Sequence, residues 1–178
     1  MSTLDLAPRP PAARTAPVRW GSLSFAASAR KHVEAAFAYL SQDAVERTLI
    51  DRLLHGPVHH RIVIGHHDDD SYDPNTHAIH WDPHSALITT LGGRQSPALG
   101  LGHEIDHAVE NPALEDRLAS ALDLRYDNLE ERRVVLGSER HAALTLHEGL
   151  RYDHSGTCYK VAGPTLRRTG SLGRAADQ

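Results

Sequence analysis

The segment His103-Glu104-Ile105-Asp106-His107 constrains this chain more than any other feature, because its spacing is useful only on a helix. Four residues of an α-helix turn through about 400°, so His103 and His107 lie on one face, one turn apart. Two imidazole nitrogens can then bind one zinc ion, and Glu104 can reach a water molecule on that ion. The segment therefore predicts a helix that carries a metal site.

Local signals on both sides limit this helix. Ser96 is a favourable N-cap and Pro97 a favourable first helical residue. Asn111-Pro112 stops a helix, because proline cannot donate a backbone hydrogen bond and restricts the residue before it. The sequence therefore predicts a helix between these two signals, with the histidines in its second half.

Apolar periodicity and turn residues predict the other elements. Residues 113–126 are expected to connect two helices, with a helical turn around 114–122. Two short strands are expected over 61–65 and 77–81, paired because the link between them is rich in turn residues. The other helices are expected over 33–40, from the N-cap Asp43 to Gly56-Pro57, from Asp127 or Asn128 to Leu136, and, after a break at Gly137-Ser138, up to Gly149 as the C-terminal glycine.

Length and composition describe an ordinary globular protein. The chain has 178 residues, of which 40% are hydrophobic and 24% charged, which suits one domain. We predict a disordered leader over 1–18, a domain over 19–165 and a frayed tail over 166–178. The expected fold class is α+β, with a small antiparallel sheet or hairpin packed on several helices that include the histidine helix.

Several kinds of protein are disfavoured by the composition. The net charge of −4 does not suit a nucleic-acid partner, and no apolar run reaches the ~18 residues of a membrane span. Cys158 is the single cysteine, which excludes a disulfide framework and a cysteine-rich zinc fold. The 14 histidines instead favour metal binding. We therefore expect no nucleic acid and no membrane as partner. The metal motif instead predicts a protein or peptide substrate, for a chain that we expect to be a monomer.

A catalytic zinc site needs a third protein ligand and an open position. Asp127-x-x-Glu130 has the pattern of a capping box, in which Glu130 serves the backbone at a helix N-terminus. That interpretation leaves Glu131 free, so we predict zinc bound by His103, His107 and Glu131. The alternative is that both glutamates only complement the helix dipole. The wider set of candidates is Glu110, Glu115, Asp123, Glu130, Glu131 and His141.

Attack on a peptide carbonyl places negative charge on its oxygen, and sites for this chemistry add a hydrogen-bond donor. We predict Tyr159 and Arg151 as such donors, with Glu104 as the general base. The alternatives are a surface salt bridge for Arg151 and a packing role for Tyr159. The full set of donors is Tyr126, His147, Arg151, Tyr152, His154 and Tyr159.

Several segments resemble the NleD-like zinc metallopeptidases, peptidase family M91, over about 61–164. They are the HEIDH segment, the run Glu-Glu-Arg-Arg-Val-Val-Leu-Gly over 130–137, the run Leu-His-Glu-Gly-Leu-Arg over 146–151 followed by Tyr159, and the region 72–83. The Glu-Glu-x-Arg element is similar to clostridial neurotoxin light chains, in which the second glutamate binds zinc. Two positions differ from the usual family pattern. Gly149 stands where the family usually has asparagine, and Gly156 stands where it usually has arginine.

The resemblance implies a minimal zincin fold and a gluzincin-like zinc endopeptidase. NleD-like proteins are effectors of pathogenic bacteria that cut host signalling kinases, which implies virulence and a non-cleaved signal that directs secretion into a host cell. If the protein is not an effector, we expect it to be located in the cytoplasm.

Two other functions compete with the endopeptidase. One is a catalytically inactive, zincin-shaped binding protein with a structural metal, which the departures at Gly149 and Gly156 motivate. The other is a histidine-rich protein that sequesters several metal ions.

Overall fold

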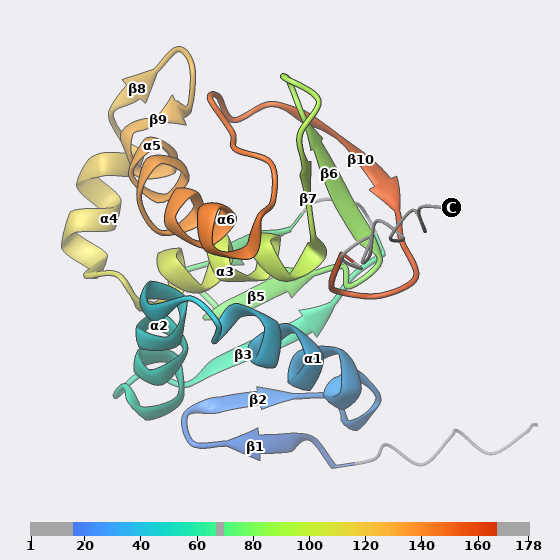
Figure 1. Ribbon diagram of the computed structural model, residues 1–178. Coiled ribbons are helices and arrows are strands. Elements are labelled where there is room, and N and C mark those ends of the chain that lie inside the picture. The colour runs from blue at the N-terminus through green and yellow to red at the C-terminus, as the bar shows by residue number, and fades with distance from the viewer. Residues whose placement is uncertain (1–15, 67–69, 167–178) are drawn as a thin grey trace, which may run out of the picture.

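The computed structural model describes residues 16–66 and 70–166 and has a mixed α+β architecture, which confirms the predicted fold class (Figure 1). Residues 1–15 of the predicted leader and 167–178 of the predicted tail lie outside the described residues. The last part of the predicted leader overlaps the first strand, which begins at Val18.

The main sheet has five strands in the order β1-β2-β3-β5-β4. They are β1 (Val18–Trp20), β2 (Leu23–Phe25), β3 (His60–Ile64), β5 (Ala78–Trp81) and β4 (Ser71–Asp73). The two predicted strands, β3 and β5, do pair, but in parallel, with Ile62 opposite Ile79. These two strands therefore do not form a hairpin with each other: the main sheet is mixed, and the smaller sheets of the fold are antiparallel. The chain first passes through β4, which pairs antiparallel with β5 at the sheet edge, and the turn-rich link belongs to that pair.

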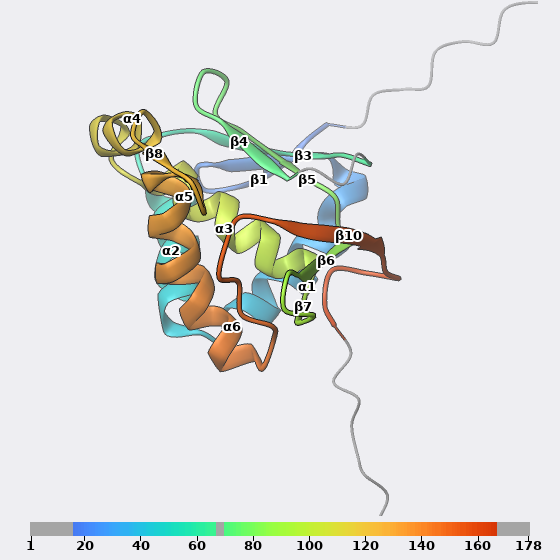
Figure 2. The same ribbon diagram turned by 90° about the horizontal axis from the view of Figure 1, so that it is seen from above.

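Helices gather on one face of this sheet (Figure 2). The first three are α1 (Arg30–Leu40), α2 (Ala44–His55) and α3 (Pro97–Val109), and their apolar faces share one core with the sheet. Further along the chain lie α4 (Pro112–Ala119), α5 (Leu129–Val134) and α6 (Arg140–Leu146). Within the described residues, no helix combines the length and apolar character of a membrane span.

Two smaller sheets complete the fold. One has the order β10-β6-β7, with β10 (Gly156–Lys160), β6 (Ser85–Thr89) and β7 (Arg94–Gln95). The other joins β8 (Leu122–Asp123) to β9 (Asp127–Asn128). The sequence did not predict these strands, because β6 gains its main partner from β10, about 70 residues later in the chain.

Two side chains fix the start of the histidine helix in place. The predicted cap Ser96 accepts a hydrogen bond from the backbone N–H of Leu99 at 3.2 Å. Trp81 is fully buried in β5, and its indole N–H donates to the carbonyl of Pro97 at 2.8 Å. The start of α3 is therefore tied both to its own cap and to the sheet, which gives the histidines a rigid support.

The helix after α5 continues further than predicted. A π-helical turn over Val135–Glu139 joins α5 to α6, and Gly137 (φ −97°, ψ −106°) marks the kink where a break was expected. Gly149 is not the C-terminal glycine: His147 ends α6 in the left-handed region, at φ 59°. The capping interpretation of Gly149 was therefore wrong.

Glu46 of α2 is a fully buried carboxyl group beside the histidine helix. A Cβ atom at Gly102 would lie 2.6 Å from Oε2 of Glu46, so a glycine here lets α2 approach α3 closely. Neither oxygen of Glu46 has a hydrogen-bond partner among the described residues. Burial, together with the charges of Asp106 and Asp43, raises the pKa of Glu46 to about 8.

We expect Glu46 to make the folded chain less stable as pH rises. The folded state binds this proton more tightly than the unfolded state, whose ordinary pKa is 4.5, so stabilisation present below pH 4.5 is lost as pH rises to about 8. Denaturant unfolding should show the free energy of unfolding of the wild type falling by on the order of 3–5 kcal/mol more than that of Glu46→Gln between pH 4 and pH 9. Parallel curves for the two metal-free proteins would contradict this expectation.

Candidate metal centre

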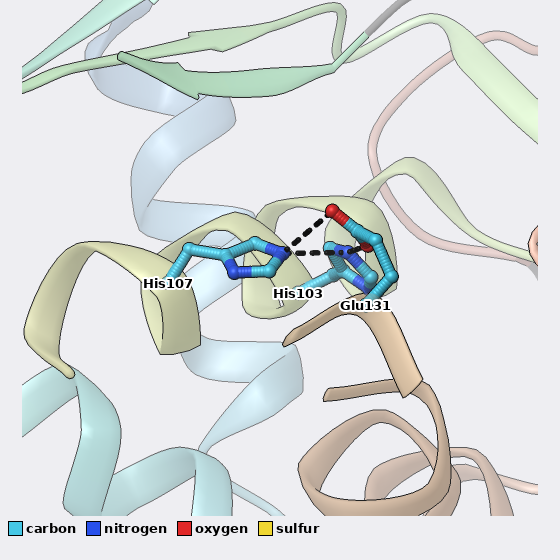
Figure 3. Close-up of side chains that lie close together, drawn as sticks. All are labelled: His103, His107 and Glu131. Carbon is cyan, nitrogen blue, oxygen red and sulfur yellow. Dashed lines mark hydrogen bonds and ion pairs between the residues drawn. The ribbon is translucent and has the colours of Figure 1, made fainter. Parts of the chain in front are cut away.

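Three side chains from two helices converge at one point. His103 and His107 lie on α3 and Glu131 on α5, and their ligand atoms all lie within 4.8 Å of one another (Figure 3). The two Nε2 atoms are 3.1 Å apart, and the Glu131 carboxylate oxygens lie 2.9 Å from Nε2 of His103 and 3.4 Å from Nε2 of His107. In the described part of the chain, this is the one such group that could hold a metal ion.

A carboxylate behind each histidine fixes the orientation of its ring. Nδ1 of His103 lies 2.8 Å from Oε2 of Glu139, and Nδ1 of His107 lies 3.2 Å from Oε1 of Glu130. A proton on each Nδ1 donates to these carboxylates, so both Nε2 lone pairs face Glu131. Three acceptors then point at one another, an arrangement that needs a cation.

The electrostatics of the ion-free chain agree with that need. Burial would lower the pKa of His103, but hydrogen bonds to Glu131 and Glu139 outweigh it and raise the pKa to about 10. Burial would also lower the pKa of His107, but hydrogen bonds to Glu130 and Glu131 outweigh this effect and raise the pKa to about 9. Burial would raise the pKa of Glu131, but hydrogen bonds from both histidines outweigh this effect and hold the pKa far below its ordinary value. Protons on the two histidines then supply the positive charge beside Glu131. A divalent cation would replace these protons and bind all three side chains.

Glu131 reaches the histidines by a route other than the one predicted. The N-cap of α5 is Asn128, whose side chain accepts from the backbone N–H of Glu131 at 2.9 Å. Asp127, the predicted cap, has φ 69° and binds His154 instead. Glu130 is 2% exposed and binds His107 and Arg133, so the predicted capping box is wrong. The assignment of Glu131 to the metal cluster nevertheless agrees with the structure.

The other candidate ligands lie elsewhere. Glu110 and Asp123 pair with arginines, at 3.5 Å from Arg133 and 3.2 Å from Arg132 respectively. His141 binds Asp43, at 2.6 Å. Glu115 lines the cleft described next, but it is not part of the metal cluster.

A cleft of about 280 Å³ opens beside the cluster. Its walls include Glu104, His107, Glu131 and, from the edge strand β4, Ser71 and Tyr72. Burial raises the pKa of Glu104, although the two histidines act in the opposite direction. The structure therefore brings the predicted base to the same cleft as two of the three clustered side chains, His107 and Glu131.

Of the six predicted donors, His154 lines this cleft. Its Nε2 lies 3.1 Å from Oε2 of Glu131 and its Nδ1 2.6 Å from Oδ2 of Asp127. Arg151 and Tyr159 are not among the described residues that line it. Arg151 donates to Glu139 at 3.1 Å and to the backbone oxygen of His154 at 2.9 Å, so it acts from behind the site. Tyr159 has a buried hydroxyl group, and Arg94 lies over its ring at 5.7 Å.

No family model, curated protein or solved structure matches the chain. The function must therefore be argued from the geometry of this centre together with the sequence resemblance.

Glu139 is the functional residue that sequence reasoning missed. It is 2% exposed and holds His103 at 2.8 Å, while Gln95 donates to its other oxygen at 2.8 Å. The signal in the sequence is weak, because a lone glutamate after a predicted helix break has no spacing relation to the histidines. It reaches His103 through the π-helical turn, which no local pattern predicts.

Removal of the Glu139 charge should weaken metal binding. Loss of an outer carboxylate behind a ligating histidine typically lowers metal affinity by about 10–100-fold, because the carboxylate orients the ring and raises its basicity. We expect Glu139→Gln to raise the Kd for zinc by that factor in competition with a chromophoric chelator. Glu148→Gln is the matched control, because Glu148 is a partly buried carboxylate that accepts from Ser96 and Tyr39 and contacts neither histidine. Equal Kd values in the wild type and Glu139→Gln would show that Glu139 does not support His103.

Proposed function

We propose that this protein is a zinc-dependent endopeptidase. The observation that carries the proposal is the convergence of His103, His107 and Glu131 beside a cleft that His107, Glu131 and Glu104 line. Two imidazoles and one carboxylate form a donor set that suits zinc, with room for a fourth ligand on the cleft side. Zinc, when bound, would lower the pKa of a water molecule and polarise the carbonyl group of a peptide. The sequence resemblance to NleD-like metallopeptidases supports the same chemistry and a zincin type of fold.

Glu104 would act as the proton shuttle. Its carboxylate accepts a proton from the water that attacks the carbonyl carbon, and the same proton then passes to the leaving amine nitrogen as the C–N bond breaks. A carboxylate of ordinary pKa binds a proton only weakly near neutral pH. A carboxylate whose pKa is raised can both accept and release a proton there. The burial that raises the pKa of Glu104 therefore suits both halves of this role.

His154 is the donor best placed to stabilise the oxygen of the attacked carbonyl group. It lines the cleft, and its ring stacks on that of His103 with centroids 6.2 Å apart. Asp127 and the backbone of Arg125 hold the residue, the latter by a hydrogen bond of 3.0 Å from the His154 backbone N–H. We therefore assign to His154 the role predicted for Tyr159, with Arg151 as a positioning residue behind it.

The departures at Gly149 and Gly156 have a local explanation. A Cβ atom at Gly149 would lie 2.6 Å from Cα of Gly93, and one at Gly156 would lie 2.5 Å from Cδ1 of Leu87. A side chain at Gly149 would therefore clash with the backbone of Gly93, whereas one at Gly156 would require the Leu87 side chain and the Ile88 carbonyl oxygen, 2.9 Å away, to shift. These contacts explain the two glycines by packing, and the inactive binding protein remains the alternative function.

The proposal is tested by metal content and peptide cleavage. Elemental analysis of the purified protein should find one zinc per chain, and the zinc-loaded protein should cut members of a random peptide library that mass spectrometry reads. Removal of zinc by a chelator should stop cleavage, and its return should restore it. One bound zinc without cleavage of any peptide would favour the binding protein, and several tightly bound ions would favour the sequestering protein. The effector role, the host substrate and the place of action stay predictions from the resemblance.

A further inference from the structure

A second cavity, of about 520 Å³, lies next to the metal cleft. Its walls come from the C-terminal ends of α2 and α3, the start of α4 and the turn between β4 and β5. Tyr72 and Glu115 line both hollows, so the cavity and the cleft share a boundary. Val109 lies two residues after His107, about 3 Å further along the helix axis. The cavity is therefore within reach of a chain bound at the metal centre.

The cavity has an apolar wall that the fold leaves unfilled. The residues that form this wall are Pro57, Val58, Pro74, Ala108, Val109 and Pro112. The volume falls within the range of sites that bury small ligands and is large enough for any single side chain. Apolar surface that is concave and continuous with a reaction site favours an apolar group of the molecule that reacts there.

The charges around the cavity favour a basic residue next to the apolar group of the bound molecule. Among the acidic lining residues, Asp51 pairs with His55 at 3.0 Å, and Glu110 lies 3.5 Å from Arg133. The Arg52 guanidinium donates to the backbone oxygen of Val109. The carboxylate of Glu115 has no ion pair or hydrogen bond among the described residues, and it stands at the boundary of the two hollows. Its charge is therefore available to a cation that lies between them.

We propose that this cavity determines substrate specificity: it binds a bulky apolar side chain of the peptide, and Glu115 binds a basic residue between that side chain and the scissile bond. This inference rests on the proposed function and specifies its substrate class. We place the basic residue and the apolar side chain on the same side of the scissile bond, because Tyr72 and Glu115 line both the cavity and the cleft.

Library cleavage by surface variants tests the proposal. Val58 is 36% exposed at the cavity wall, so Val58→Trp should narrow the cavity at little cost to the fold. We expect it to lower kcat/KM for the preferred peptide by about 10–100-fold, the effect of burying one large apolar side chain. The same peptide with alanine at that position should be cut equally by both proteins. Glu115→Gln, an independent variant of unchanged size, should remove the preference for lysine or arginine.

Leu144→Trp is the matched control, because Leu144 is 57% exposed on α6 and lines neither hollow. Zinc content and Tm should be the same in all four proteins. Fluorescence anisotropy measures direct binding of the preferred peptide to zinc-loaded Glu104→Gln. The double variant Val58→Trp/Glu104→Gln should bind this peptide more weakly, by the same factor as the fall in kcat/KM. Peptide cleavage with unchanged sequence preference in both cavity variants would overturn the inference and leave the endopeptidase intact. Zinc binding without cleavage of any peptide would overturn the proposed function and the inference with it.

Discussion

Glu104→Gln is expected to abolish measurable peptide hydrolysis while one zinc stays bound per chain. Glutamine has the shape of glutamate but cannot accept the proton of the attacking water, and loss of such a group typically costs about 10²–10⁴-fold in rate. Glu104 is 7% exposed in the cleft and is not among the three clustered ligands, so the variant should keep the metal. The measurements are kcat for a fluorogenic peptide that the wild type cuts and zinc content by elemental analysis.

Glu148→Gln is the control for the Glu104 prediction. It removes a partly buried carboxylate from the same region, where Glu148 accepts from the backbone N–H of Ser96 at 2.6 Å, yet it does not line the cleft. Activity should survive in this control. Retained hydrolysis in Glu104→Gln would show that another group accepts the proton. Loss of zinc from that variant would show that the Glu104 charge helps to hold the ion.

The features that the sequence predicted well are those that local chemistry determines. Ser96-Pro97 and Asn111-Pro112 bound α3 because capping and proline geometry act within a few residues. Asp43 likewise caps α2, where it accepts from the backbone N–H groups of Val45 and Glu46. The i, i+4 spacing of His103 and His107 then fixes their shared face, so two of the three clustered ligands follow from the helix alone.

The features that the sequence did not predict depend on contacts between distant segments. Residue spacing does not show that β3 pairs in parallel with β5 while β4 takes the sheet edge. The π-helical turn places Glu139 behind His103, and only the packed structure reveals that bond. The capping pattern of the sequence predicts Asp127 as the N-cap of α5, whereas the structure has Asn128 there, and both place Glu131 in the first turn of the helix. The capping box predicted from the sequence and the cap seen in the structure thus lead to the same residue, because both depend on the same helix start.

The choice between Glu130 and Glu131 can be tested directly. Glu131 has both oxygens within 3.4 Å of the histidine Nε2 atoms, whereas Glu130 contacts Nδ1 of His107 and the guanidinium of Arg133. Glu131→Ala removes a ligand, so we expect zinc affinity to fall by more than the 10–100-fold that is typical of an outer-shell partner. Glu130→Ala removes an outer-shell partner, so its Kd for zinc should rise within about that range.

Chelator competition on the wild type and both variants measures these affinities, and elemental analysis after dialysis should find zinc lost from Glu131→Ala alone. Glu130→Ala also leaves Arg133 with Asp106 as its nearest carboxylate, at 2.8 Å, so Tm separates any loss of stability from loss of metal. A larger loss of affinity in Glu130→Ala would exchange the two roles. Full zinc content in both variants would place the third ligand elsewhere. The two glutamates are neighbours in the chain but approach opposite nitrogens of His107, and the ligand must be the one on the Nε2 side, where the lone pairs of both histidines meet.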